Sequence, residues 1–308
     1  MKLLFASDSF KGTLSSDQTI ELLTKAAEEV FGSCETSGVP VADGGEGTTD
    51  AVVKARNGEI ITVPVHGPLM EMEQGFYGRL SESEAILEMA AASGLPMVPE
   101  EKRNPLNTTT YGTGELMKAA LDAGYTEIAI AIGGSATNDG GMGFASALGI
   151  RFLDQEGNVL EGRGEDLEKV AHIDMSGLDP AVQKAHFTVM CDVTNPLCGP
   201  DGATYTFGKQ KGGTPEILDR LEKGMQNYRD VIIREFGINP DEIQGSGAAG
   251  GLGPDYEKIY AHGISSIMTT VDGPMPLKDA LDNAVELYYK GAIRMFRFIQ
   301  TGMKMNTK

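Results

Sequence analysis

Four glycine-rich segments of this chain carry acidic, amide or lysine side chains that could act on a phosphate group. They are Asp8-Ser9-Phe10-Lys11-Gly12-Thr13, Asp43-Gly44-Gly45-Glu46-Gly47-Thr48, residues 133–141 (Gly-Gly-Ser-Ala-Thr-Asn-Asp-Gly-Gly) and residues 192–200, which begin Asp192-Val193-Thr194-Asn195. Glycine lets backbone N–H groups come close to a ligand, whereas Asp and Asn can hold a divalent cation or accept a proton. The combination favours phosphate chemistry.

Three of the acidic residues in these segments follow predicted strands. Asp8, Asp43 and Asp192 would all lie at the carboxyl ends of strands, where ligands bind in α/β sheets. A single Asp at such a position is more often a helix cap or a turn former. The repetition, with glycine close by, favours a shared site over three independent caps.

The 133–141 loop lies between a predicted apolar strand and a predicted helix. It offers polar side chains and glycine N–H groups to a phosphate or carboxylate at a helix N-terminus. The residues concerned are Gly133, Gly134, Ser135, Thr137, Asn138 and Asp139. The alternative is a tight turn in which glycine is needed only for packing. No segment matches G-x-x-x-x-G-K-[ST], so a P-loop is excluded.

Composition restricts the class of ligand. The formal net charge is -18, from 26 Lys plus Arg against 44 Asp plus Glu, which argues against binding nucleic acid. An acidic chain that binds an anion needs local cations, and Lys11, Arg103 and Lys211 lie beside glycine-rich segments. The alternative is that they are solvated surface residues. The four histidines lack metal-ligand spacing, and no Ser-His-Asp pattern on G-x-S-x-G supports a hydrolase.

The sequence also indicates a compartment. No segment approaches the roughly 18 apolar residues of a membrane-spanning helix, and the three cysteines form no evident disulfide set. We therefore expect a cytoplasmic protein with no membrane partner. A homo-oligomer is compatible with the sequence, which does not define the number of subunits.

Apolar periodicity predicts alternating strands and helices. Strands are expected at 2–6, 36–42, 60–65, 74–79, 85–89, 127–132 and 187–191, helices at 15–30, 48–56, 113–123, from 142 onward, 215–236, 256–261 and 277–300, a hairpin at 151–160 and a short segment at 266–271. Repeated strand–loop–helix units predict a parallel sheet with its loops at the carboxyl edge. The short runs between 60 and 89 predict antiparallel strands in another domain.

The order of the motifs resembles that of the type I glycerate kinases. The matching blocks are D-S-F-K at 8–11, A-D-G-G-E-G-T at 42–48, E-M-A-A-A-S-G at 88–94, R-N-P at 103–105, Y-G-T-G-E at 111–115, the 133–141 loop, C-D-V-T-N-P at 191–196, Q-K-G at 210–212 and G-A-A-G-G-L-G at 247–253. The resemblance is dense up to Gly253 and resumes from about residue 255. So many ordered blocks make a chance similarity implausible.

This resemblance implies a kinase that transfers the γ-phosphoryl group of ATP, with Mg²⁺, to a hydroxyl of D-glycerate, giving 2-phosphoglycerate. It implies a Rossmann- or flavodoxin-like three-layer domain of residues 1–65 and 254–308, a mixed α/β domain of residues 66–253 with antiparallel strands, and a cleft between them. The implied residues are Asp192 and Lys11 for catalysis, Asp8, Ser9, Lys11, Asp43 and Arg103 for substrate, Gly133, Gly134, Ser135, Thr137, Asn138, Asp139 and Lys211 for nucleotide or phosphate, and Asp192 and Asp43 for metal.

The chain departs from the family pattern in one place. Roughly 70 further residues are expected after Gly253, including a block resembling G-E-G-x-x-D-x-Q-T-x-x-G-K with a phosphate-contacting lysine. Here Gly253 runs directly into Pro254. Three explanations stay open: a deletion form with little catalysis, an active form completed by another subunit, and a faulty gene prediction.

Two other classes of function stay open beside the kinase. One is a catalytically impaired homologue that binds a carboxylate or acts as a regulatory protein. The other is a Mg²⁺-dependent phosphatase, which the loop-borne acids alone would allow. Glycerate binding without turnover would indicate the first, and nucleotide-free hydrolysis of phosphoglycerate the second.

Overall fold

The structure, a computed structural model, describes residues 2–8, 15–31, 34–42, 44–191 and 193–252. The chain divides into two compact units, Met1–Val41 with Val271–Lys308, and Ala42–Thr270. The division falls after Val41, whereas the sequence analysis placed it after residue 65. The elements predicted at 256–261, 266–271 and 277–300 lie outside the described residues.

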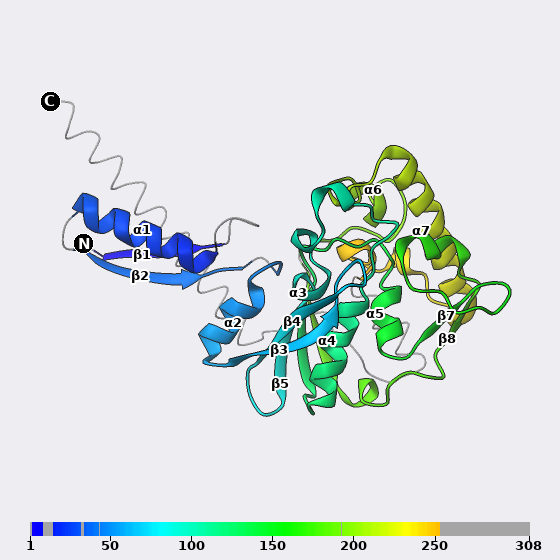
Figure 1. The fold of residues 1–308 in the computed structure, drawn as a ribbon, viewed down its shortest axis with the longest axis horizontal. Coiled ribbons are helices and arrows are strands. Elements are labelled where there is room, and N and C mark those ends of the chain that lie inside the picture. The colour runs from blue at the N-terminus through cyan, green and yellow to red at the C-terminus, as the bar shows by residue number, and fades with distance from the viewer. Residues whose placement is uncertain (1, 9–14, 32–33, 43, 192, 253–308) are drawn as a thin grey trace. The chain divides into compact units, whose positions relative to one another are not determined.

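The described part of the first unit is a strand–helix–strand arrangement, as predicted (Figure 1). It consists of β1 (Lys2–Ser7), α1 (Ser16–Phe31) and β2 (Glu35–Pro40). β1 and β2 pair in parallel, with Phe5 opposite Gly38. A Cβ on Gly38 would lie 2.2 Å from Cγ2 of Ile20, so glycine lets α1 pack closely on this face of the strand pair.

Helix α1 begins where its capping residues predict. The backbone N–H of Ser15 donates to Oε1 of Gln18 at 2.8 Å, and the N–H of Gln18 donates to Oγ of Ser15 at 3.2 Å. This reciprocal pair is a capping box, which satisfies N–H groups that the first turn of a helix leaves without partners.

A mixed five-stranded sheet forms the centre of the second unit. Its order is β3-β4-β5-β6-β9, with bounds β3 (Glu59–His66), β4 (Met72–Arg79), β5 (Glu84–Glu88), β6 (Glu127–Ala131) and β9 (His186–Met190). β4 is antiparallel to both β3 and β5, whereas β5, β6 and β9 pair in parallel. Strands β3, β5, β6 and β9 therefore end at one edge. Both the antiparallel and the parallel predictions are confirmed.

Helices α2 (Thr48–Arg56) and α4 (Tyr111–Asp122) cover opposite faces of this sheet (Figure 1). A Cβ on Gly78 would lie 2.2 Å from Cγ2 of Val53 in α2, and one on Gly75 would lie 3.0 Å from Cδ2 of Leu116 in α4. Residues three apart in a strand point to opposite faces. The two glycines of β4 thus allow one helix to approach from each side. The short helix α3 (Ala90–Ser93) follows β5 directly.

The remainder of the second unit packs around the long helix α7. The elements are α5 (Met142–Ala147), β7 (Arg151–Leu153), β8 (His172–Asp174), α6 (Ala203–Phe207) and α7 (Pro215–Phe236). Pro215 at the first helical position and Gly237, with φ 69°, at the end delimit α7 at the predicted residues. Its inner face buries Leu221, Met225 and Tyr228 in the core.

The hairpin predicted at 151–160 is present only in part. Residue Leu153 forms an isolated antiparallel bridge with Val159, but β7 pairs along its length with β8, which comes later in the chain. Local patterning identified the turn and missed the distant partner strand.

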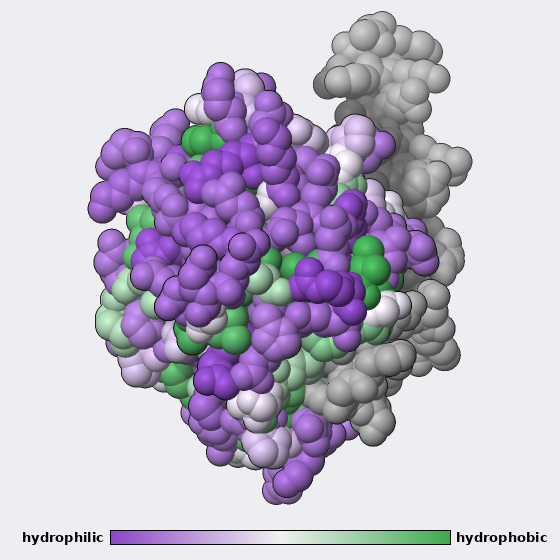
Figure 2. All heavy atoms as spheres, turned by 90° about the vertical axis from the view of Figure 1, so that its right-hand side faces the viewer, coloured by the Kyte–Doolittle hydropathy of each residue, from purple (hydrophilic) through white to green (hydrophobic). Residues whose placement is uncertain are grey.

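The predicted three-layer Rossmann-like architecture stays a prediction, because the described residues of the first unit contain only β1, α1 and β2. Figure 2 shows a mostly hydrophilic face with small separated apolar patches, in keeping with a net charge of -18. Within the described ranges, no helix has the length and apolar character required to cross a membrane.

Candidate functional site

Two of the four glycine-rich segments lie against each other at the carboxyl edge of the five-stranded sheet. The N–H of Gly133, just after β6, donates to the carbonyl oxygen of Gly44 at 2.9 Å. A Cβ on Gly133 would lie 2.8 Å from Cα of Gly45, so only glycine permits this contact. The two loops thus pack on each other, although the strand that precedes residues 44–48, β2, pairs with β1 in a separate two-stranded sheet.

The segments that flank the two predicted metal-binding acids also meet at this edge. A Cβ on Gly44 would lie 3.5 Å from the carbonyl oxygen of Met190, the last residue of β9. Gly44 follows Asp43 in the chain, and Met190 precedes Asp192 by two residues. Asp43 and Asp192 themselves lie outside the described residues, as do Ser9 and Lys11.

Only the beginning of the 133–141 loop is accessible. Gly133 is half-buried and Gly134 exposed, while residues 135–141 are buried. The backbone N–H of Gly134 can therefore reach a ligand in this arrangement, whereas the N–H of Gly133 is already hydrogen-bonded to Gly44. The side chains of Thr137, Asn138 and Asp139 face the interior, each fully buried.

Asp139 is surrounded by internal hydrogen-bond donors. Its carboxylate accepts from the N–H and Oγ1 of Thr110 at 2.7 and 2.8 Å, and from the N–H groups of Gly141 and Gly143 at 3.1 and 3.3 Å. Burial raises the pKa of Asp139, and these hydrogen bonds oppose that rise. The carboxylate joins the start of α4 to the start of α5, which orders the loop between them.

Two other polar atoms of the loop are buried and lack a partner among the described residues. They are Oγ1 of Thr137 and Oδ1 of Asn138. The amide of Asn138 donates to Oγ1 of Thr204 at 3.2 Å, which fixes its orientation. Buried polar atoms without partners are costly, so a donor or a cation reaching this part of the loop would be stabilised there.

Lys211 supports the loop from beneath. It lies in the 3₁₀ turn η5 (Lys209–Lys211), and its Nζ donates to Oγ of Ser135 at 2.8 Å and to the carbonyl oxygen of Thr137 at 2.6 Å. Burial lowers the pKa of Lys211 to about 7, although the negative charge of Asp139 acts to raise it. The following residue, Gly212, packs closely on the backbone of Arg103. A Cβ on Gly212 would lie 2.2 Å from the carbonyl oxygen of Arg103. Lys211 and Arg103 are therefore neighbours through the backbone.

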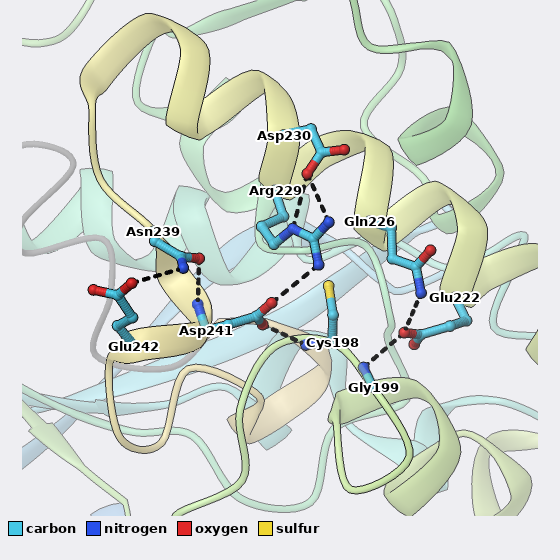
Figure 3. Close-up of polar contacts among 9 residues, drawn as sticks. All are labelled: Cys198, Gly199, Glu222, Gln226, Arg229, Asp230, Asn239, Asp241 and Glu242. Carbon is cyan, nitrogen blue, oxygen red and sulfur yellow. Dashed lines mark hydrogen bonds and ion pairs between the residues drawn. The ribbon is translucent and has the colours of Figure 1, made fainter.

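The segment after Asp192 is fixed by acidic side chains from α7 and from the turn η6 (Pro240–Glu242), as Figure 3 shows. The N–H of Cys198 donates to Oδ1 of Asp241 at 2.8 Å, and the N–H of Gly199 donates to Oε1 of Glu222 at 2.7 Å. Arg229 donates to the other oxygen of Asp241 at 3.1 Å. Burial and the nearby acids raise the pKa of the Cys198 thiol, so this cysteine is a poor nucleophile.

The predicted residues thus fall into three groups. Gly133, Gly134, Ser135, Thr137, Asn138, Asp139, Lys211 and Arg103 lie in or against one loop cluster of the second unit. Asp8 follows β1 in the first unit. The remaining predicted residues are those outside the described ranges. Within residues 2–8, 15–31, 34–42, 44–191 and 193–252, no cluster of three or more His, Cys, Asp or Glu could hold a metal ion.

Sequence reasoning assigned no role to Glu88, Thr110 and Glu222, which the structure places as buried polar supports of the site loops. Glu88 carried a usable signal, because an acid between Leu87 and Met89 in an apolar strand must find hydrogen-bond donors when buried. Thr110 and Glu222 carried none, because a polar residue before a helix or within an amphipathic helix is usually exposed to solvent.

Comparison with known proteins gives the family of this site and fold. A sequence profile described as the glycerate kinase family matches residues 3–254. The glycerate kinase of Bacillus subtilis (strain 168) is 45% identical over 285 residues, covering 91% of this chain and 75% of the relative. The glycerate 2-kinase of Escherichia coli (strain K12) is 44% identical over 254 residues, covering 82% of this chain and 67% of the relative.

A solved structure agrees. The crystal structure of putative glycerate kinase 2 from Salmonella typhimurium LT2 superposes with a TM-score of 0.72 at 43% identity, covering 87% of this chain and 71% of that one. The chain belongs to the glycerate kinase family. It spans between 67% and 75% of the length of the two curated relatives named above.

Proposed function

We propose that this chain is an ATP-dependent glycerate kinase that phosphorylates a hydroxyl of D-glycerate and gives 2-phosphoglycerate. The observation that carries the proposal is the family match over residues 3–254, which includes every glycine-rich segment of the site. The 2-position is supported by the name of the Escherichia coli relative, a glycerate 2-kinase. An ATP co-substrate follows from the kinase class.

The two acids Asp43 and Asp192 are proposed to act as a pair. Support comes from the close approach of Gly44 to Met190, since each acid is within two residues of this contact. Asp192 is proposed to accept the proton of the attacking hydroxyl and Asp43 to orient the substrate, with both available to Mg²⁺. When bound, Mg²⁺ neutralises charge on the phosphate groups.

The cations and loop glycines are proposed to complete the site. Lys11 and Arg103 would neutralise the glycerate carboxylate or the transferring phosphoryl group, with Asp8 and Ser9 orienting the substrate. The N–H of Gly134 would donate to a phosphate oxygen, and Gly133, whose N–H is hydrogen-bonded to Gly44, would let the phosphate approach the loop closely. Phosphoryl transfer depends mainly on in-line positioning and cancellation of charge, which this set of residues supplies.

The alternative function is a catalytically impaired homologue that binds glycerate or another carboxylate. One observation favours it: the family match ends at residue 254, next to the point where the family's G-E-G-x-x-D-x-Q-T-x-x-G-K block is expected. Glycerate binding by calorimetry, with no ADP formed in the presence of Mg-ATP, would identify this form.

The role of Asp192 is tested by the substitution Asp192→Asn. Since a general base contributes about 100- to 10,000-fold, we expect glycerate-dependent ADP formation to fall by at least about 100-fold. The thermal unfolding transition should stay unchanged. Asp201→Asn is the matched control, because Asp201 is an exposed acid directly after the same segment, and it accepts the hydrogen bond from Asn195 through its backbone carbonyl oxygen. Near-normal activity of Asp192→Asn would contradict the assignment.

A further inference from the structure

Glu88 is a buried carboxylate at the carboxyl edge that holds the beginning of another element. It is the last residue of β5 and is only 2% exposed. Its Oε1 accepts from the N–H of Gly47 at 3.1 Å, and its Oε2 accepts from the N–H of Thr49 at 2.8 Å. Both oxygens are thus used by the first turn of α2, whose N-terminal N–H groups have no partners within the helix.

The side chain of Glu88 replaces a local cap that the helix lacks. The N-cap residue of α2 is Gly47, with φ 90°, which has no side chain to accept a hydrogen bond. A carboxylate is also favoured there by the helix dipole. The start of α2, and with it the residues that lead into it, is therefore set by an acid from a different strand, 39 and 41 residues away.

The residues that Glu88 fixes belong to the 44–49 segment, which packs on the 133–141 loop. Between Asp43 and α2 lie only residues 44–47, and Gly44 accepts the hydrogen bond from Gly133. A Cβ on Gly134 would lie 3.7 Å from the backbone nitrogen of Glu46, so the second loop follows the same segment closely. Displacement of the 44–49 segment would move both loops at once.

We infer that Glu88 is a positioning residue for phosphoryl transfer, which acts by fixing the 44–49 segment and thereby the start of the 133–141 loop that packs on it. The inference rests on the proposed function. Glu88 contacts no reacting group itself. Ionised, it offers two strong acceptors to two N–H groups, whereas a neutral side chain offers one good acceptor and leaves one N–H poorly paired.

Burial and hydrogen bonds act in opposite directions on the pKa of Glu88, and burial is the larger influence. Burial raises its pKa, the N–H groups of Thr49 and Gly47 lower it, and the charge of Asp50 on α2 raises it. The isosteric change Glu88→Gln keeps the shape of the side chain and turns one acceptor into an NH₂ group facing an N–H donor. Glu84→Gln is the matched control, since Glu84 begins the same strand, is half-exposed and pairs with Arg56 on the surface.

The experiment combines steady-state kinetics with hydrogen exchange on the full chain. In Glu88→Gln we expect kcat/KM for glycerate to fall about 100-fold, the effect of an ångström-scale misplacement, with a raised KM as well as a lowered kcat. We expect the amides of the peptide covering 44–50 to exchange at least about 10-fold faster while peptides of β3 and β4 keep their protection. Glu84→Gln should stay within about twofold of the unmodified chain in both measurements.

Two results would overturn the inference. One is an unchanged KM with kcat lowered only in proportion to the folded fraction. The other is faster hydrogen exchange spread over the whole second unit. Either result would indicate that Glu88 only stabilises the fold. If Glu88→Gln does not fold, Glu88→Asp takes its place: its shorter carboxylate keeps the charge and should show a smaller change of the same kind. Wild-type exchange and KM in Glu88→Asp would then refute the inference. Absence of turnover in the unmodified chain, with exchange at 44–50 still controlled by Glu88, would refute the proposed function and not the positioning contact.

Discussion

Individual buried ionisable side chains hold the site loops in place. Burying a charge is costly unless hydrogen bonds replace its hydration. Lys211, Asp139 and Glu88 each meet this condition with donors or acceptors from a loop that is distant in the sequence. Each therefore joins elements that local sequence preferences cannot join.

Lys211 makes the stability of the protein depend on pH. Its pKa is about 7 in the folded chain and near 10.5 when unfolded. Between these values the unfolded chain binds more protons, so the free energy of unfolding rises with pH, by at most about 1.4 kcal/mol per pH unit from this group. The stabilisation relative to low pH is absent below pH 7 and complete above about 10.5. We expect Lys211→Met to lack this rise.

Denaturant unfolding of both chains at pH 6 to 10 measures the difference. Lys209→Met is the control, because Lys209 is exposed in the same turn and should leave the pH dependence intact. Parallel curves for the unmodified chain and Lys211→Met would contradict the buried, titrating ammonium group. At the alkaline end, the variant should also be less stable by about 1 to 3 kcal/mol, since Ser135 and Thr137 lose their donor.

Sequence could predict which residues gather at the site but not which of them face a ligand. The types and spacing of Ser135, Thr137 and Asn138 indicated a phosphate loop, and the loop is where it was expected. Their burial depends on a segment that comes later in the chain. The N–H of Gly140 donates to the carbonyl oxygen of Gly250 at 3.0 Å. A Cβ on Gly250 would lie 2.1 Å from the carbonyl oxygen of Thr137. A contact between segments about 110 residues apart has no local signal.

Elements with clear end signals were predicted closely. Helix α7 begins at Pro215 and ends before Gly237, and α2 ends before Asn57, which adopts φ 51°. These residues fix the helix ends through backbone geometry, so they can be read from sequence. The pairing of β7 with β8 could not be predicted from sequence, because the partner of Arg151 is Asp174 rather than a residue near the adjacent turn.

The close packing of the two loops predicts that glycine is required at position 133. In Gly133→Ala the added Cβ would lie 2.8 Å from Cα of Gly45 and 3.0 Å from the carbonyl oxygen of Gly44, so backbone must move. We expect kcat/KM to fall at least about 10-fold through loop displacement. The comparison is with Gly157→Ala, where nothing lies within 4 Å and only a positive φ in a remote turn is disturbed.

Steady-state kinetics on both variants, with thermal unfolding alongside, test this requirement. Gly157→Ala should lose some stability without loss of activity. Full activity in Gly133→Ala would show that the approach of the two loops at the sheet edge is unimportant for turnover.

For the whole molecule, the family profile covers the described part of the second unit, and the superposed crystal structure covers most of the chain. The profile covers residues 3–254, and the superposed crystal structure covers 87% of the chain. That residues 1–65 and 254–308 form one domain stays a prediction; the described contacts place β3 in the five-stranded sheet of the second unit.

The central claim is that this chain catalyses phosphoryl transfer to glycerate. The most direct measurement is ADP formation by the purified 308-residue chain with Mg-ATP, with and without D-glycerate. We predict glycerate-dependent turnover at about 1 to 100 per second, the usual range for kinases. A folded protein that binds glycerate and forms no ADP above the glycerate-free control would contradict the claim and identify a binding form of the family.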